Sequence, residues 1–387
     1  MFFLKHQLGE DIRNVRKELK LTKEKLARLS GINVKTLRLL ENGKRIGKIE
    51  TFLKIKNALQ KNFNFDLAER AGIKIIWDLE DLDSEGLNII KGGLLGDGCV
   101  TKYGTYQQEA KDKKYLEWLG GLLNKNGINC KVVSIKHKNS YSKSKTFYCL
   151  YTHSCPAFFE LRKRWYIKNN KGKEIKGIPT DIELAPITLL HWYLGDGNFK
   201  RDDRELPKGS RPSLRLYVND FLREDIGLLL GKLKRTFDLN FYPLPKLNTN
   251  NEKGYVLYLY SNDLFNFFKL IGFKPPQEIR DCVTEIRNGK PHTFKEKWPN
   301  ECDWIKIFAK TTGTGKLLRE KRKELGLTQR ELAEKISVKK HHISEIECGR
   351  KRMSLQCFTK ILKALKLEKR KNFLANELIE AIPEVLR

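Results

Sequence analysis

Two short stretches of the sequence resemble each other, and they constrain the fold more than any other feature. Residues 89–98 read IIKGGLLGDG and residues 189–197 read LLHWYLGDG. Each is an apolar run of about two helical turns that ends in Gly-Asp-Gly, with Asp97 and Asp196 as the acids. A carboxylate at the negative pole of a helix is electrostatically unfavourable. If the two helices packed side by side, the carboxylates would meet, and a divalent cation would relieve their repulsion.

The charge of the chain indicates a polyanionic partner. Among its 387 residues, Lys and Arg number 76 and Asp and Glu number 47, which gives a formal net charge of +29. An excess of this size is typical of proteins that bind nucleic acid. The alternative is the lysine-rich surface of a heat-stable protein, but such surfaces balance lysine with glutamate, and here the acids do not keep pace. The length favours two or three domains.

Cysteine usage and hydropathy favour a soluble protein in a reducing compartment. None of the 8 cysteines forms a CxxC pair, so we expect neither a zinc cluster nor a disulfide framework. The opening MFFLKHQLGED becomes charged too soon for a signal peptide, and no apolar run reaches the roughly 20 residues that span a bilayer. We therefore expect reduced thiols, no membrane segment and a cytoplasmic location.

Residues 1–65 are predicted to form an N-terminal domain with two short helices joined by a tight turn. Thr22 is a suitable N-cap for a helix through Leu29, the turn contains Gly31, and a second helix is expected at 34–40. The pattern resembles the helix-turn-helix of the phage repressor and Xre type. The resemblance implies that DNA is faced by Lys23, Lys35, Thr36 and Arg38. The alternative is a helical bundle that binds protein.

The central segment, residues 84–282, is predicted to contain one supersecondary unit twice. The elements expected after Asp97 are a strand-forming run at 99–108, a helix at 111–124, strands at 131–137 and 146–152, and a helix at 156–165. The elements expected after Asp196 are a strand at 213–218, a helix at 223–237, strands at 241–246 and 255–260, and a helix at 262–270. We therefore predict an α+β fold with two αββαββα halves, at about 84–178 and 179–282.

With these elements, the chain resembles the LAGLIDADG homing endonucleases in their single-chain, two-motif form. Besides the two Gly-Asp-Gly motifs, the resemblance rests on LEWLGGLL (116–123), KGIPTDIELAPITLLHWYLGDG (176–197) and SLRLYVNDF (213–221). It covers about half of the chain. It implies a duplicated αββαββα core in a monomer that binds double-stranded DNA and makes a metal-dependent break in both strands, with short 3′ overhangs.

The resemblance also assigns candidate catalytic residues. Hydrolysis of a phosphodiester needs a water nucleophile, an electrophile on the phosphate and charge relief at the leaving oxygen, which metal ions held by acids can supply. By the resemblance, Asp97 and Asp196 bind Mg²⁺ (or Mn²⁺) and are catalytic. Lys176 matches the catalytic lysine of the first half. Its second-half counterpart falls at Arg280, where the family usually has lysine.

Each of these signals also has a plainer interpretation. A Gly-Asp-Gly can be a helix C-cap and turn, although a duplicated pair disfavours this. His191 stands where the family often has a small residue, and bulky Trp192 follows it, so we expect His191 to be a packing residue rather than a base. Gln108 and Asn219 are further candidates for polar groups beside the metal ions.

Sequence specificity is expected to come from the strands, because a β-ribbon fits the major groove of DNA. The candidate DNA contacts on or beside the strands are Lys102, Tyr103, Lys136, Lys138, Lys143, Lys145, Arg215 and Tyr217. A basic run between residues 162 and 176 leads into the second motif, and we expect it to contact phosphates rather than form an ordinary solvated face.

The C-terminal part is predicted to be a linker at 283–316 followed by a second helix-turn-helix domain at 317–387. The linker ends in KTTGTGK, which lacks the spacing of a P-loop. Residues 327–352 align without gaps with the N-terminal helix-turn-helix. By that resemblance, the residues that face DNA are Gln329, Lys339, Lys340, His341, His342 and Ser344. We expect the adjacent histidines to point apart and to face solvent or DNA rather than a metal ion.

Three functions remain open from the sequence. The first is a site-specific DNA endonuclease with two accessory DNA-binding domains, which would lengthen the contact with a rare site. The second is a transcription regulator on an inactive endonuclease fold, of the WhiA type, although that interpretation expects loss of the acids. The third is an intron RNA maturase, in which RNA would replace DNA as the partner. An intein is disfavoured, because no Cys or Ser opens the chain and no His-Asn closes it.

Overall fold

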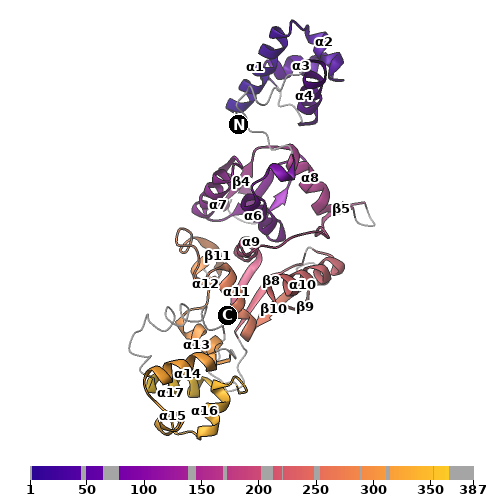
Figure 1. Ribbon diagram of the computed structural model, residues 1–387. Coiled ribbons are helices and arrows are strands. Elements are labelled where there is room, and N and C mark those ends of the chain that lie inside the picture. The colour runs from indigo at the N-terminus through magenta and orange to yellow at the C-terminus, as the bar shows by residue number, and fades with distance from the viewer. Residues whose placement is uncertain are drawn as a thin grey trace.

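The protein consists of four units that follow one another along the chain. The computed structural model describes residues 2–44, 49–63, 78–137, 145–168, 172–201, 212–219, 221–247, 253–287, 290–310, 314–351 and 353–365. From top to bottom, Figure 1 shows a helical N-terminal module, the two halves of an α+β core, and a helical C-terminal module. Within the described residues, no helix combines the length and the apolar character that crossing a membrane requires.

The N-terminal module consists of α1 (Phe2–Glu18), α2 (Lys23–Leu29), α3 (Val34–Glu41) and α4 (Ile49–Phe63). The predicted helix-turn-helix is confirmed at α2 and α3. Thr22 Oγ1 accepts a hydrogen bond from Lys25 N at 3.1 Å, and Asn33 Oδ1 accepts one from Lys35 N at 2.8 Å, so side chains cap both helices. Gly31 in the turn has a φ of +59°, a conformation that favours glycine. The module has a hydrophobic core of its own.

The two halves of the core have the same order of elements, and the predicted duplication is confirmed. The first half consists of α6 (Ser84–Leu95), β1 (Cys99–Val100), β2 (Tyr106–Ala110), α7 (Lys113–Lys125), β3 (Cys130–His137), β4 (Lys145–Thr152) and α8 (Pro156–Trp165). The second consists of α9 (Pro186–Asp196), β7 (Gly197–Lys200), β8 (Ser213–Tyr217), α10 (Arg223–Phe237), β9 (Tyr242–Leu247), β10 (Lys253–Tyr260) and α11 (Ser261–Ile271). Each half is therefore αββαββα.

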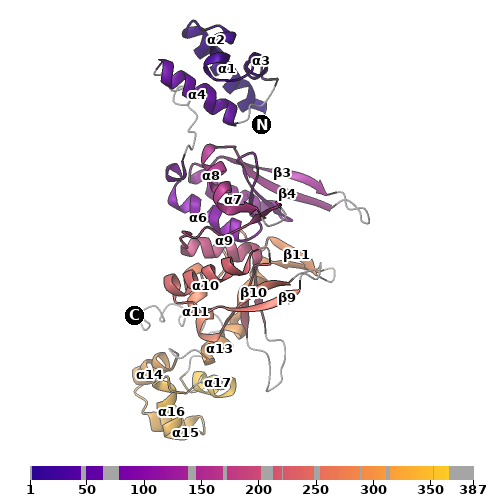
Figure 2. The same ribbon diagram turned by 90° about the vertical axis from the view of Figure 1, so that its right-hand side faces the viewer.

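The two antiparallel sheets also share one topology. Their strand orders are β1-β2-β4-β3 and β7-β8-β10-β9, so the last two strands of each half pair as a ribbon. Helix α7 packs on the first sheet and α11 on the second, and Figure 2 shows β3, β4 and β9 on the side of the molecule away from α6 and α10. A short hairpin, β5 (Tyr166–Lys168) and β6 (Glu174–Lys176), precedes the second motif, and a 3₁₀ turn (Leu79–Asp81) precedes the first.

The two motif helices, α6 and α9, pack side by side between the sheets. Gly92 permits this approach, because a Cβ there would lie 2.5 Å from Thr188 O and 2.7 Å from His191 Cβ. The bulk of His191 in α9 is thus accommodated by a glycine in α6. His191 is fully buried and its ring stacks on Trp118, with centroids 5.6 Å apart. Such surroundings are those of a packing residue.

The segment 283–316 is folded, so the prediction of a linker is wrong. It contains the hairpin β11 (Val283–Arg287) and β12 (Lys290–Thr293), followed by α12 (Phe294–Lys297), α13 (Glu301–Lys310) and the start of α14 (Thr314–Glu324). Its aromatic residues are buried against α11: the Trp304 ring lies 5.5 Å from Phe268 and 5.5 Å from Phe273. The physical reason for the error is that two prolines suggested a loop, whereas one stands in a strand and the other in the connection between α12 and α13.

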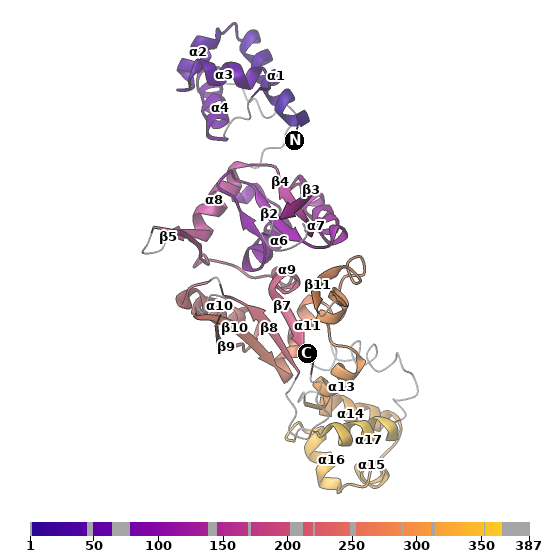
Figure 3. The same cartoon turned by 180° about the vertical axis from the view of Figure 1, so that it is seen from behind.

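The C-terminal module consists of α14, α15 (Gln329–Lys335), α16 (Lys340–Glu347) and α17 (Leu355–Ala364). Here the second predicted helix-turn-helix is confirmed at α15 and α16. Figure 3 shows α13 between α11 and this module, and Met353 N donates to Ala309 O at 3.1 Å. The buried residues of this module belong to the same hydrophobic cluster as the core, whereas those of the N-terminal module form a separate one. The C-terminal module is therefore packed onto the second half.

Candidate active site

The C-terminal ends of α6 and α9 converge, which brings the two motif aspartates together. A Cβ placed on Gly195 would lie 3.5 Å from Asp97 Oδ2 and 3.5 Å from Gly96 Cα. Asp97 is exposed and Asp196 is half-buried. The two acids thus lie at the two helix ends that touch, because small residues let the helices approach each other there.

The donor set at this point suits a hard cation. Mg²⁺ usually binds one or two carboxylates, while water and phosphate oxygens complete its coordination. Among the described residues, no group of three or more His, Cys, Asp or Glu side chains is arranged to hold a metal ion. Asp97 and Asp196 therefore fit a magnesium or manganese ion that also binds a phosphate, and they do not fit a closed zinc site.

Lys176, at the end of β6, reaches the end of the first motif helix. Its Nζ donates to Gly96 O at 3.0 Å and to Gly98 O at 2.9 Å, on either side of Asp97. The ammonium also lies 5.9 Å from the centre of the Phe221 ring. A cation at the C-terminus of a helix is favourable, so Lys176 offsets the unfavourable carboxylate at the same pole. The structure thus places this predicted residue at the motif.

Lys297, in α12, occupies the corresponding position at the second motif. Its Nζ donates to Leu194 O at 2.7 Å and to Gly195 O at 2.9 Å, and lies 5.7 Å from the centre of the Phe294 ring. The Tyr193 hydroxyl donates to the carbonyl of Lys297 and ties α12 to α9. Lys297 is therefore the second-half counterpart of Lys176, and the sequence did not identify it.

The sequence assigned this position to Arg280, whereas the lysine that contacts the second motif in the structure is Lys297. Arg280 is half-buried, and its backbone carbonyl accepts a hydrogen bond from Lys295 N at 2.9 Å. The Arg280 backbone therefore supports the start of α12. One signal in the sequence could have indicated the helix that carries this lysine. Thr293 and Glu296 form a capping box with Thr293 as the N-cap, which predicts a helix that begins at Phe294.

A cavity of about 520 Å³ lies between the two halves at the motif ends. Asp97, Gly195 and Lys297 line it together with Glu109 of β2 and Thr284 of β11. Segment 283–297 also contacts the first half: Val283 N donates to Asp112 Oδ2 at 2.9 Å, and the Phe294 ring lies 4.8 Å from Tyr115. The segment that supplies Lys297 thus spans both halves.

Gln108 lines the same cavity, but its amide is held by two tyrosines. Its Oε1 accepts from the Tyr106 hydroxyl at 2.6 Å, and its Nε2 donates to the Tyr115 hydroxyl at 3.0 Å. Burial raises the pKa of both phenols, and the negative charge of Asp97 contributes, so the tyrosines stay protonated. Asn219, the other polar candidate, is exposed and packs on Gly254, where a Cβ would lie 2.5 Å from its Oδ1.

One buried histidine and one half-buried cysteine lie near the motifs, and neither is suited to acid–base chemistry. Burial lowers the pKa of His191 to about 3, so its imidazole remains neutral. Burial raises the pKa of the Cys99 thiol despite the neighbouring charge of Lys176, so the thiol remains protonated.

The strand residues predicted to contact DNA fall into three groups. Arg215 and Tyr217 lie on β8, half-buried, and Arg215 stacks over Tyr258 with its Cζ 5.1 Å from the ring centre. Lys102 and Tyr103 are exposed in the turn between β1 and β2. Lys136 and Lys145 belong to β3 and β4, whereas Lys138 and Lys143 lie outside the described residues.

The basic run before the second motif is partly committed to structural contacts. The Arg162 guanidinium donates to Val100 O, pairs with Glu174 and stacks over Tyr166, with its Cζ 4.3 Å from the ring centre. Arg164 pairs with Asp181. These two arginines hold α8 against the strands around it, so the expectation of phosphate contacts applies to the lysines of the run.

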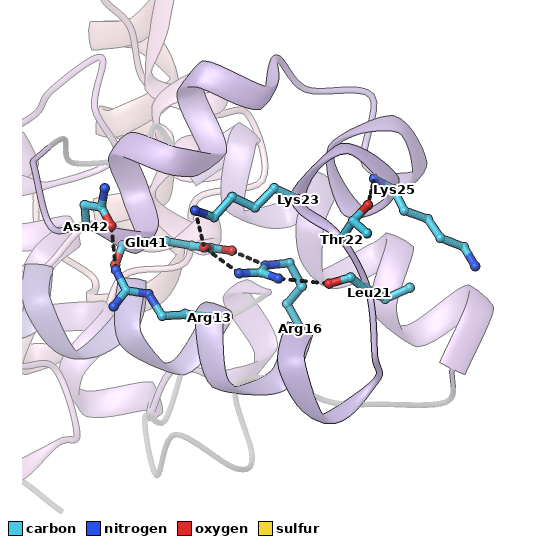
Figure 4. A network of polar contacts seen from close by, with 8 residues as sticks. All are labelled: Arg13, Arg16, Leu21, Thr22, Lys23, Lys25, Glu41 and Asn42. Atoms are coloured by element: carbon cyan, nitrogen blue, oxygen red, sulfur yellow. Dashed lines mark hydrogen bonds and ion pairs between the residues drawn. The ribbon is translucent and has the colours of Figure 1, made fainter.

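Both helix-turn-helix modules contain the same buried ion pair. Arg16 Nε lies 2.6 Å from Glu41 Oε1 in the N-terminal module, and Arg322 Nε lies 2.6 Å from Glu347 Oε1 in the C-terminal one. Figure 4 shows how Glu41 also faces Lys23, whose Nζ is 4.0 Å from the carboxylate. The pair joins α1 to α3 and α14 to α16, and so fixes the second helix of each motif.

The predicted DNA-facing residues of these modules are mostly exposed. Lys35 and Arg38 are exposed on α3, while Thr36 and Lys23 are half-buried. On the C-terminal side, Lys339, Lys340 and His341 are exposed, and His342 and Ser344 are half-buried. Gln329 Nε2 donates to Glu347 Oε2 at 2.8 Å, which orients that side chain. The rings of His341 and His342 are nearly parallel, with centroids 6.0 Å apart, rather than pointing apart.

Comparisons with known proteins agree with this arrangement. Residues 87–267 match the sequence model of the LAGLIDADG DNA endonuclease family, and residues 12–65 and 318–371 each match a helix-turn-helix model. No curated protein sequence matches the chain.

Three solved structures are similar to parts of the chain. The homing endonuclease I-WcaI bound to its DNA recognition sequence is 20% identical, with a TM-score of 0.45, covering 63% of this chain and 98% of that one. The N-terminal LAGLIDADG domain of DUF199/WhiA is 15% identical, with a TM-score of 0.32, covering 51% and 86%. Mesophilic variants of the homing endonuclease I-DmoI are 14% identical, with a TM-score of 0.28, covering 48% and 95%.

Proposed function

Since residues 87–267 belong to the LAGLIDADG DNA endonuclease family and a helix-turn-helix domain stands at each end, we propose that the protein is a site-specific, metal-dependent endonuclease that cuts both strands of a long DNA target. One observation carries the proposal. Asp97 and Asp196 meet at the ends of α6 and α9, and each motif end also holds a lysine, Lys176 or Lys297. The two halves thus present the same set of groups twice, one for each strand.

The two aspartates would hold the divalent ion, and their carboxylates would orient water toward the scissile phosphate. A bound Mg²⁺ or Mn²⁺ supplies an activated water and charge relief at the leaving oxygen. Asp97 is exposed at the cavity between the halves, where a phosphate can approach it. Metal binding requires these carboxylates in their deprotonated form.

Lys176 and Lys297 would place one positive charge beside each scissile phosphate. Each ammonium is fixed by two backbone carbonyls, so its position is set before DNA binds. A preorganised cation at the point where negative charge develops stabilises the transition state without reorganisation. The two lysines would thus act as electrostatic groups, and the neutral His191 takes no part in proton transfer.

The terminal modules support the proposal of a long target. Their exposed cationic residues, such as Lys35, Arg38 and Lys339, lie on or beside the second helix of each motif, the helix that enters the major groove in helix-turn-helix proteins. Linking several binding modules raises the effective concentration of each on the same DNA, which tightens binding to a rare site. We propose that the chain acts as a monomer, because it contains both motifs.

Cleavage of DNA by the purified protein tests this function. A random double-stranded library is incubated with the protein and Mg²⁺, and the ends that appear are sequenced. We expect one long site to be cut in both strands, and Asp97→Asn or Asp196→Asn to abolish cutting while binding persists. Cutting in EDTA, or a complete absence of cut sites with Mg²⁺ and Mn²⁺, would refute the proposal.

A transcription regulator on an inactive endonuclease fold is the second candidate. Its supporting observation is that both terminal modules match a helix-turn-helix model, a kind of domain that binds specific DNA sequences. It predicts sequence-specific binding with no cleavage under any metal condition, and binding that Asp97→Asn leaves unchanged. An RNA maturase would instead bind structured RNA more tightly than DNA. Binding titrations with both nucleic acids separate these outcomes.

A further inference from the structure

The two sheets expose faces of different chemistry, although they share one topology. In each sheet the residues alternate between the face that the helices cover and the opposite face. On the helix-covered faces, Leu150 of β4 and Leu216 and Leu257 of the second sheet are fully buried. Their strand neighbours therefore point away from the helices, toward the side on which a DNA duplex would lie if the proposed function holds.

The open face of the first sheet is largely apolar near the cavity. Strand register places Glu109, Cys149 and Val133 in one cross-strand row, and Phe147 and Ile135 in the next. Val133, Ile135 and Phe147 are half-buried, and Phe147 also lines the cavity beside Phe294 of α12. Glu109 is exposed and is an acceptor only. This part of the face thus offers methyl groups and very few hydrogen-bond donors.

The row of the second sheet that contains Arg215 carries donors and aromatic rings instead. Register places Asn198, Arg215, Tyr258 and Tyr242 in this row, whereas Val256 and Leu244 in the next row are apolar. The Arg215 side chain is half-buried and its guanidinium stacks over Tyr258 at 5.1 Å, while its buried Nε has no hydrogen-bond partner within the described residues. A guanidinium held in this way can donate its terminal N–H groups to the two acceptors on the major-groove edge of guanine.

We propose that the two half-sites differ in chemistry: the first sheet reads C5-methyl groups of pyrimidines through Val133, Ile135 and Phe147, whereas the second reads guanine through Arg215. The thymine methyl is the only apolar group on the major-groove edge of the four unmodified base pairs, and apolar side chains recognise it by contact. Val133 and Ile135 are two residues apart on β3, a spacing of roughly 7 Å or about two base-pair steps.

This inference rests on the proposed binding of DNA, and uracil substitution tests it directly. The site selected from the random library is synthesised with single thymines replaced by deoxyuracil, which removes only the methyl group. Affinity of the unaltered protein is measured in EDTA to prevent cutting. We expect each critical methyl in the first half-site to be worth roughly fourfold in affinity, the value for one buried methylene-sized group. Uracil elsewhere should have no effect.

Protein variants identify which half-site each sheet contacts. In Val133→Ser/Ile135→Ser, the uracil penalty of the first half-site should fall, because serine lacks the methyl groups of valine and isoleucine while Phe147 remains. The matched control is Leu244→Ser on β9, an exposed apolar residue of the other sheet, which should leave that penalty unchanged. A further substrate replaces the critical thymine–adenine pair with 5-methylcytosine–guanine. If the protein reads only the methyl group, this substrate should retain affinity. If the protein reads other groups of thymine, the substrate should lose affinity.

The outcomes separate the two proposals. A selected site without thymines in the first half-site, or equal uracil penalties in both halves, overturns the inference and leaves the endonuclease function standing. A library that yields no enriched site overturns the function and the inference together. Because the uracil arm uses the unaltered protein, a folding defect in the serine variant cannot mask the result.

Discussion

Replacing Lys297 by methionine should convert the enzyme from a double-strand cutter into a nicking enzyme. The Lys297 ammonium is fixed by Leu194 O and Gly195 O at 2.7 and 2.9 Å, at the end of the second motif helix. Methionine retains most of the side-chain volume and removes the charge. Because Lys176 serves the other motif, only one of the two phosphates loses its cation.

The size of the effect follows from the role of a fixed charge in the transition state. Loss of one preorganised donor or cation at a developing negative charge costs about 100-fold to 1,000-fold in rate, or roughly 3–4 kcal/mol. The rate of cutting the strand at the first motif should change by less than about twofold, because the two lysines act on different phosphates. The nicked circle should therefore accumulate before any linear product appears.

A supercoiled plasmid that contains the selected site provides the assay, since supercoiled, nicked and linear forms separate on a gel. Strand-specific end labels show which strand is cut. Lys176→Met should leave the opposite strand uncut, and Arg280→Met is the matched control that should behave as the parent. Affinity measured in EDTA should stay within a few-fold for all three variants. If Lys297→Met linearises the plasmid at the parental rate while Arg280→Met does not, the structural assignment is refuted.

Three further outcomes concern stability. Gly92→Ala places a Cβ 2.5 Å from a backbone oxygen of α9, so it should force the motif helices apart and lower the melting temperature. Gly121→Ala is the control, because its Cβ would have no atom within 4 Å and should leave the melting temperature unchanged. Arg16→Ala removes the closest partner of the buried Glu41 carboxylate, leaves Lys23 at 4.0 Å, and should cost up to about 3–5 kcal/mol, seen by calorimetry in the N-terminal module alone. Arg322→Ala should also lower the transition of the core. The pKa of the buried His191 imidazole is about 3, against an ordinary value of 6.5. As the pH falls from 6.5 toward 3, the unfolded chain binds a proton at this histidine and the folded chain does not. The free energy of unfolding therefore decreases over this pH range. Between pH 7 and 5 the loss should be about 2 kcal/mol by urea unfolding, and His191→Phe should remove that part of the pH dependence.

Features that depend on neighbouring residues in the sequence could be predicted. The helix-turn-helix at Thr22–Glu41 carries its own cap and turn residues, and local hydrogen bonds are sufficient to specify it. The duplicated core could be predicted because each half repeats the same pattern of helix and strand periods. The meeting of Asp97 and Asp196 followed from the duplication, since related halves pack their equivalent helices together.

Features that depend on register between distant segments could not be predicted. Nothing near His191 in the sequence reveals that Gly92 stands opposite it, because that pairing is set by how α6 and α9 slide along each other. The same holds for Lys297, which reaches the motif only because the hairpin β11–β12 returns the chain to the cavity. Resemblance pointed to Arg280 at this position, while the side chain that arrives there comes from the next short helix.

The two motifs differ in how their lysines are supplied, although the final geometry is similar. Lys176 is the last residue of β6, directly before the second half, and its side chain reaches back to the first motif. Lys297 comes from a segment that also contacts the first half, through the hydrogen bond from Val283 N to Asp112 and the Phe294–Tyr115 ring contact. Both cations therefore depend on how the two halves pack, because the Lys176 ammonium lies 5.9 Å from the centre of the Phe221 ring in the second half. Their partners across the interface differ: Lys176 faces one ring, whereas the Lys297 segment makes a backbone hydrogen bond and a ring contact. A DNA duplex that bends or spreads the halves would therefore change the two environments differently, so the two strands need not be cut at equal rates even though the fold is duplicated.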